Sequence, residues 1–179
     1  MAQQPPHSNA WLAIRRPLLV AVVFGCAVSL MTSGRLSFRL AAPATLYWTF
    51  VPLFEIAGLA AVWPWKRSKI SFARAIDLFF GNNIPWLLWF TAFAAAWAFL
   101  PPARMFAWSG NPRPWYASAL AVGLWCAWLD FRFFREIPGR TPARACRDLA
   151  VERFIAWTGG VAWFMGPAAW QVVASRFGL

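Results

Sequence analysis

The stretch TFVPLFEIAGLAAVW, residues 49–63, places one carboxyl side chain, Glu55, inside an otherwise apolar segment. A charged carboxylate that faces lipid is costly, so we expect Glu55 to be neutral and to face other helices. Pro52 has no amide hydrogen, which leaves the carbonyl oxygen of Trp48 free as an acceptor. Thr91, at a matching depth in another apolar segment, is the expected partner across the helix interface. These four residues form the predicted intramembrane polar site.

Two kinds of function fit such a site. Glu55 could carry protons or contact a substrate in a transporter or channel component, or it could hydrogen-bond two helices or a partner subunit. A proton relay needs a chain of ionisable groups. The sequence suggests no second acid, Lys or His near Glu55, so we favour the structural role.

The other acidic residues do not form a recognisable catalytic set. Each has an arginine within a few residues, which predicts solvated ion pairs for Asp77, Asp130, Glu136, Asp148 and Glu152. Asp130 and Glu136 could form the carboxylate pair of an enzyme that acts on lipids. The neighbouring Arg132 and Arg135 favour structural pairing instead, so we expect no catalytic residues and favour a protein that is not an enzyme.

The chain has one histidine, His7, and three cysteines that lie far apart in the sequence, Cys26, Cys126 and Cys146. Zinc and haem sites built from these residue types need closely spaced ligands. No phosphate-binding glycine loop is present either. We therefore expect neither a metal nor a cofactor.

The composition is that of a polytopic membrane protein. Of its 179 residues, 60% are hydrophobic and 13% are charged, against about 25% charged in an ordinary soluble domain. The mean hydropathy is +0.50, and 14 Trp and 17 Phe are spread along the chain. The net charge of +11 comes from short basic clusters between apolar segments, which is typical of membrane topology and not of nucleic-acid binding.

Backbone groups in hydrocarbon must bond within the chain, so each long apolar run predicts a helix. There are five runs, over about 17–33, 43–65, 84–101, 115–131 and 154–175. Twelve basic residues fall on one side of these spans: Arg15, Arg16, Lys66, Arg67, Lys69, Arg74, Arg132, Arg135, Arg140, Arg144, Arg147 and Arg153. Five fall on the other: Arg35, Arg39, Arg104, Arg113 and Arg176. The excess places the N-terminus in the cytoplasm and the C-terminus outside.

Two further features of the helices can be predicted. The first run could be a cleaved signal, but the bulky Phe24 in VFGC does not suit a cleavage box, and we favour an uncleaved span. Before the third span, four apolar side chains share one helical face: Phe72, Ile76, Phe79 and Phe80. This pattern fits a short amphipathic helix in the membrane interface, begun by Ser71 and ended by Gly81, or equally a plain elbow between spans.

The basic loop before the last span could hold anionic lipid headgroups through Arg132, Arg135, Arg140, Arg144 and Arg147. The positive-inside rule alone also accounts for these charges. Small residues spaced four apart predict close packing of four spans, through Ala21-Gly25-Ser29, Ala92-Ala96, Ala119-Gly123-Ala127 and Thr158-Ala162-Gly166.

The expected organisation is a flexible cytoplasmic tail over 1–14 and a single five-span all-α domain over 15–179. Because only short loops join the spans and no catalytic set is visible, we predict a non-catalytic accessory, scaffold or assembly subunit of a larger complex in a bacterial-type inner (plasma) membrane. Its expected partners are membrane lipids, including anionic headgroups, and other membrane protein subunits, but not nucleic acid. The alternative is a proton-linked transporter or channel component that uses Glu55 and assembles from several copies.

Overall fold

The computed structural model describes residues 7–66, 68–100 and 113–177, which form helices and no strand. The helices are α1 (His7–Ser33), α2 (Phe38–Trp48), α3 (Phe50–Val62), α4 (Phe72–Gly81), α5 (Ile84–Phe99), α7 (Arg113–Glu136) and α8 (Pro142–Phe177). The all-helical prediction is confirmed for this part of the chain.

Three stretches are long and apolar enough to cross a membrane: Ala10–Ser33, Phe38–Val62 and Arg113–Glu136. α5 is also apolar but has only 16 residues, fewer than the roughly 20 of a typical span. These helices agree with an integral membrane protein. The predicted end of the third span at residue 101, together with Arg67 and Arg104, lies outside the described residues.

The expected N-terminal tail overlaps the first helix. α1 begins at His7, so residues 7–14 are helical. Residues 1–6 of the predicted tail lie outside the described part of the chain.

The second apolar stretch is divided into two helices at Thr49. The Thr49 amide and Oγ1 both bond the carbonyl oxygen of Leu46, at 3.3 and 2.6 Å. Pro52 lies in the first turn of α3, where a missing amide hydrogen costs least. Glu55 is seven residues before Val62, the last residue of this stretch, or about 10 Å from its end at 1.5 Å per residue. Glu55 therefore lies nearer to the C-terminal end of this stretch than to its centre.

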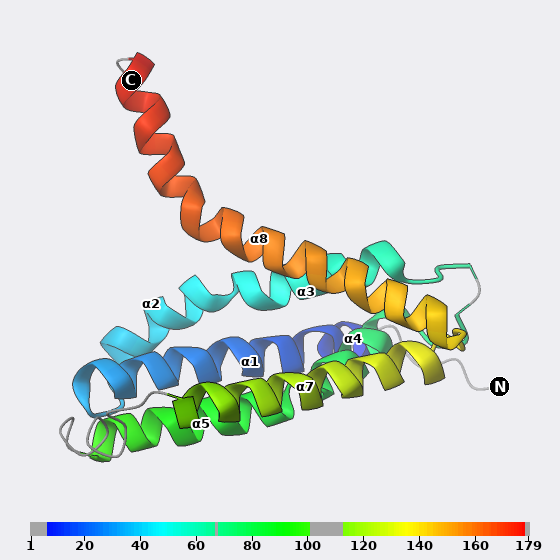
Figure 1. The fold of residues 1–179 in the computed structure, drawn as a ribbon, viewed down its shortest axis with the longest axis horizontal. Helices are drawn as coiled ribbons and strands as arrows, with labels where there is room; N and C mark the ends of the chain where they lie inside the picture. The colour runs from blue at the N-terminus through cyan, green and yellow to red at the C-terminus, as the bar shows by residue number, and fades with distance from the viewer. Residues whose placement is uncertain (1–6, 67, 101–112, 178–179) are drawn as a thin grey trace.

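Figure 1 shows α1 between α2 and α5, with α8 beginning near the end of α7 and then crossing α3. Towards its C-terminal end α8 bends away from the other helices. The core is rich in aromatic side chains from α4 and α7. The rings of Phe79 and Phe133 lie 5.3 Å apart, and both side chains are buried together with Leu59 of α3.

Small residues make the α1–α2 contact close, as predicted. A Cβ atom on Gly25 would lie 2.7 Å from the carbonyl oxygen of Ala41, and Ala21 and Ser29 are buried on the same face. This spacing is possible only because residue 25 has no side chain.

The small-residue prediction is wrong for α8. Thr158, Ala162 and Gly166 are exposed, and a Cβ on Gly166 would meet nothing within 4 Å. A glycine of this helix that does make a close contact is Gly159, which faces the ring of Phe54.

α4 is packed into the bundle rather than lying alone on a surface. Its apolar face, including Ile76, Phe79 and Phe80, is buried, and the helix contacts α1 and α7. Ser71 caps its start by accepting a hydrogen bond from the Arg74 amide at 3.3 Å, as predicted.

Candidate functional site

Glu55 is 7% exposed and faces side chains from two other segments. Its Oε2 accepts a hydrogen bond from Nδ2 of Asn83 at 2.9 Å. Its Oε1 lies 3.5 Å from Nη1 of Arg153 in α8. Glu55 is therefore not the isolated acid that the sequence suggested, because an amide and a guanidinium are its partners.

Arg153 connects Glu55 to two further acids. Its Nη2 donates to Oδ2 of Asp130 in α7, and its Nε lies 3.4 Å from Oε2 of Glu152. Oδ1 of Asp130 also accepts a hydrogen bond from Nδ2 of Asn82 at 3.0 Å. We call these six residues the charged cluster: Glu55, Asn82, Asn83, Asp130, Glu152 and Arg153.

The charged cluster contains more acids than bases. Three carboxyl groups share one guanidinium, which would give a net charge of −2 with every acid ionised. Asp130 is 1% exposed and Glu152 is 0% exposed. Neither carboxylate oxygen of Glu152 has a hydrogen-bond partner among the described residues. Because unbalanced buried charge is costly, this excess of acids favours protonation of the carboxyl groups or the binding of an additional cation.

The junction between α4 and α5 positions the two asparagines. Pro85 cannot lie inside a continuous helix, because its ring would clash with the carbonyl four residues earlier, at Gly81. α4 accordingly ends at Gly81 and α5 begins at Ile84. The two residues between them direct their amides to different carboxyl groups, Asn82 to Asp130 and Asn83 to Glu55.

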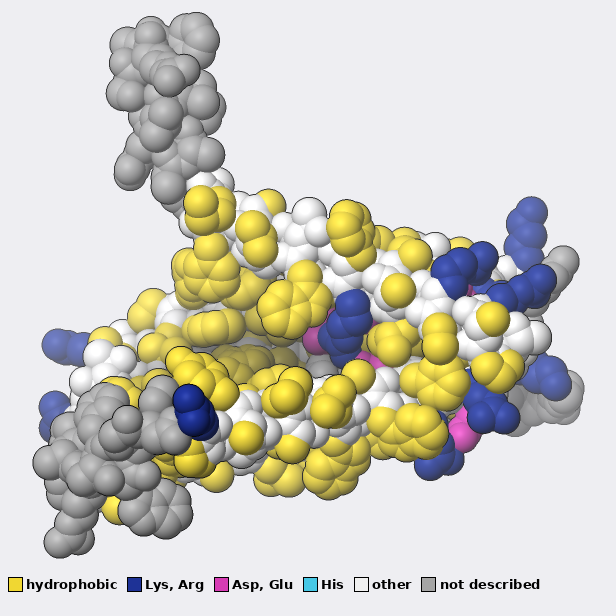
Figure 2. All heavy atoms as spheres, viewed as in Figure 1, with side chains coloured by type: hydrophobic (Ala, Val, Ile, Leu, Met, Phe, Trp, Pro, Cys, Tyr) yellow, Lys and Arg dark blue, Asp and Glu magenta, His cyan; other side chains and the backbone are white. Residues whose placement is uncertain are grey.

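A cavity of about 490 Å³ lies beside the charged cluster. Its polar end is formed by Glu55, Asn83 and Arg153, and the rest of its lining is apolar or aromatic, including Phe24 and Trp157. Figure 2 shows a basic side chain next to acidic ones in the hollow between α8 and α7, with hydrophobic side chains around them. An apolar cavity with a few convergent polar groups is the usual form of a small-molecule site.

The other predicted members of the polar site have different positions. The Trp48 ring lines the cavity and stacks on Phe24, with centroids 5.0 Å apart, and Pro52 is buried in α3. Thr91 is exposed, and its Oγ1 donates to the carbonyl oxygen of Leu87 at 2.7 Å. The partner that contacts Glu55 from this part of the chain is therefore Asn83, not Thr91.

The prediction of solvent-exposed ion pairs is wrong for four of the five remaining acidic residues. Asp77, Asp130, Asp148 and Glu152 are 0–1% exposed. Glu136 is exposed and pairs with Arg132 at 2.8 Å, as expected. Asp130 pairs with Arg153 and not with its sequence neighbours, so it does not form a carboxylate pair with Glu136.

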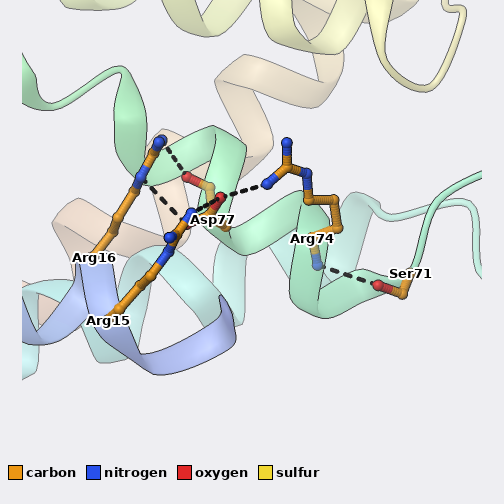
Figure 3. A network of polar contacts seen from close by, with 5 residues as sticks. All are labelled: Arg15, Arg16, Ser71, Arg74 and Asp77. Atoms are coloured by element: carbon orange, nitrogen blue, oxygen red, sulfur yellow. Dashed lines mark hydrogen bonds and ion pairs between the residues drawn. The ribbon is translucent and has the colours of Figure 1, made fainter. Parts of the chain in front are cut away.

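A second cluster joins α1 to α4 (Figure 3). The buried carboxylate of Asp77 accepts hydrogen bonds from Nε and Nη2 of Arg15 at 2.6 and 2.8 Å, and from Nη1 of Arg74 at 2.9 Å. Nη1 of Arg16 donates to the Asp77 carbonyl oxygen at 2.7 Å. The hydrogen bonds from Arg15 hold the pKa of the Asp77 carboxyl below its ordinary value, and the charges of Arg16 and Arg74 act in the same direction. The sequence predicted only that Asp77 pairs with an arginine close to it in the chain, which Arg74 is.

Three of the arginines predicted to hold lipid headgroups have partners within the chain. Arg132 bonds Glu136, and Arg140 and Arg147 lie 2.9 and 2.8 Å from the carboxylate of Asp148. Arg135 and Arg144 are exposed. Lipid binding by these five arginines stays a prediction.

The sequence does not indicate Arg153 as a member of the charged cluster. Arg153 precedes the last apolar run, where the positive-inside rule alone explains a basic residue. One signal could have identified it. The dipeptide Glu152-Arg153 directly precedes the apolar run of α8, and Asp130 lies near the end of the apolar run of α7. Each of the two helices therefore carries charged residues at the edge of its apolar run.

No group of His, Cys, Asp or Glu side chains suited to a metal ion occurs in residues 7–66, 68–100 and 113–177. No protein-family model, curated protein or solved structure matches the chain.

Proposed function

We propose that this chain is a multi-pass protein of a bacterial-type inner membrane that binds an amphiphilic small molecule in its cavity and performs no chemistry on it. It acts as an accessory subunit of a larger membrane complex. The five passes are α1, α2 with α3, α5, α7 and α8, with the N-terminus in the cytoplasm and the C-terminus outside.

The observation that carries the proposal is the pairing of an apolar cavity with a buried polar end. The cavity of about 490 Å³ is within the range of ligand sites, about 300–1,000 Å³. Charged groups within apolar membrane segments are costly to keep there, and those that are kept typically mark substrate or ion sites. Glu55 and Arg153 lie at the point where an amphiphile in the cavity would place its head.

The distribution of charge supports the orientation. Figure 2 shows most Lys and Arg side chains at one end of the molecule and few at the other. The rich end includes the loops before α4 and α8. Basic residues are retained on the cytoplasmic side of bacterial membrane proteins.

Glycine substitutions in α8 test the binding role. Gly160 lines the cavity, and a Cβ there would be in ordinary contact with Phe50 at 3.6 Å. Gly160→Leu should fill part of the cavity, while Gly166→Leu in the same helix, where a Cβ meets nothing within 4 Å, is the matched control. Native mass spectrometry of the purified chains should show an amphiphile on the wild type and on Gly166→Leu, but not on Gly160→Leu. Equal occupancy of all three would contradict the proposal.

Co-purification in a mild detergent tests whether the chain is an accessory subunit of a larger complex. The chain extracted with a gentle detergent should co-purify with another membrane protein in a fixed ratio. A strictly monomeric chain with no stoichiometric partner would contradict this part of the proposal and leave ligand binding standing.

A specific observation also favours the transport alternative. Three carboxyl groups, those of Glu55, Asp130 and Glu152, gather around Arg153, and grouped acidic side chains within a membrane segment are what a proton relay needs. The variant Glu55→Gln, assayed for proton-linked flux in proteoliposomes, distinguishes transport from a structural role. Normal folding with lost proton-linked flux would support transport, whereas loss of stability or of partner binding would support a structural role.

A further inference from the structure

We propose that the occupant of the cavity is an organic ammonium ion with one apolar chain, which reaches the site from the bilayer and places its head against Glu55. This inference rests on the proposed binding function and names the class of its ligand.

The first argument is the charge balance of the cluster. Within residues 7–66, 68–100 and 113–177, Arg153 is the one guanidinium in contact with Glu55, Asp130 and Glu152. Both oxygens of Glu152 lack a hydrogen bond to any residue that the structure describes, although the side chain is fully buried. A site with this excess of carboxylates attracts a cation and repels an anion.

The second argument is the position of Glu55. Of the three acids, it is the one that lines the cavity, and it has the longest contact with Arg153, 3.5 Å. Its Oε1 has no closer donor among the described side chains, so a cationic head entering the cavity could bond this atom. An anionic head would meet Glu55 first and would find each Arg153 nitrogen already facing a carboxylate.

The third argument is the aromatic lining. Trp48, Trp86 and Trp157 all line the cavity, and Trp157 is one helical turn from Arg153. Tryptophan faces bind ammonium groups through cation–π attraction, and apolar walls accommodate an alkyl chain. Figure 2 shows that hydrophobic side chains surround the opening between α8 and α7, so a chain can enter from lipid.

A series of ligands with one tail and different heads tests the inference. Decyltrimethylammonium, decanol and decanoate are titrated calorimetrically into the full chain in zwitterionic nanodiscs, with protein-free nanodiscs subtracted. We expect decyltrimethylammonium to bind at least about tenfold more tightly than decanol, and decanoate to bind most weakly. Glu55→Gln should reduce the preference for the cation over decanol to less than about threefold. Glu136→Gln, at an exposed ion pair, should leave it unchanged.

Each outcome distinguishes the two proposals. If decanol binds as tightly as the cation, or decanoate binds more tightly, the ligand class is wrong and cavity binding stands. If none of the three binds, the proposed function fails as well. If Glu55→Gln does not fold, Trp157→Leu replaces it, because Trp157 is 72% exposed and its loss should lower the preference at least about threefold. An unchanged preference in the folded variant would overturn the assignment of the head site.

Discussion

Gly58 of α3 lies directly against the backbone of Glu152 in α8. A Cβ atom on Gly58 would be 2.8 Å from the Glu152 carbonyl oxygen and 3.1 Å from its Cα atom. The two helices reach this separation only because residue 58 has no side chain. The contact also positions the polar site, because Arg153 follows Glu152 and Glu55 lies three residues before Gly58.

Gly58→Ala should therefore destabilise the protein by about 1–3 kcal/mol, since the added methyl group forces α3 and α8 apart. Thermal unfolding in detergent measures the loss. Gly123→Ala in α7 is the matched control, because its Cβ would make an ordinary 3.6 Å contact with Trp86, and alanine favours a helix by about 0.5–1 kcal/mol over glycine. Equal thermal unfolding midpoints for Gly58→Ala and Gly123→Ala would show that the α3–α8 contact does not need a glycine at position 58.

The sequence was sufficient for the helical class and for most helix positions. The apolar runs correspond to α1, α2 with α3, α5, α7 and α8, because backbone hydrogen bonding in apolar surroundings leaves few alternatives to a helix. Glu55, which the sequence singled out, is one of the residues of the charged cluster.

The partners of Glu55 could not be predicted in the same way. Arg153 lies 98 residues away in the chain, and its approach depends on the crossing of α3 and α8. Asn83 depends on the break between α4 and α5. Local spacing carries no information about either arrangement, so the sequence indicated Thr91 and suggested an isolated acid.

Removal of Arg153 should be the most damaging single change in the charged cluster. Arg153→Met leaves the acids of the cluster without their shared guanidinium, which we expect to cost about 3–5 kcal/mol. Arg132→Met is the control, because the exposed Arg132–Glu136 pair should contribute no more than about 1 kcal/mol. Unfolding midpoints in detergent compare the two, and similar losses would mean that the cluster does not depend on Arg153.

Glu152→Gln tests the charge excess directly. The substitution removes one acid while keeping the shape of the side chain, so wild-type stability should be retained or rise by up to about 1 kcal/mol. The same change should recover part of the loss in Arg153→Met, because fewer carboxyl groups then lack a partner. A double-mutant cycle measures this coupling, and strictly additive losses would contradict it.

Asp77→Asn should weaken the attachment of α4 to α1. Asp77 is fully buried and accepts hydrogen bonds from Arg15 and Arg74, so loss of its charge should cost about 1–3 kcal/mol. Glu136→Gln, at an exposed pair, should cost no more than about 1 kcal/mol. Thermal unfolding compares them, and an unchanged midpoint for Asp77→Asn would show that the cluster in Figure 3 adds no stability.

The lowered pKa of Asp77 also predicts how the stabilising effect of this α1–α4 contact depends on pH. Hydrogen bonding from Arg15 lowers the pKa of its carboxyl in the folded state, below the ordinary value of 3.8. A group of this kind adds stability that is fully present above its ordinary pKa and is lost as the pH falls through its folded-state pKa. The stability difference between wild type and Asp77→Asn should therefore be constant from pH 7 to about pH 5 and decrease at lower pH. Subtracting the variant cancels the titration of the other acids. A difference that grows on acidification would mean that the folded protein raises the pKa of Asp77 instead.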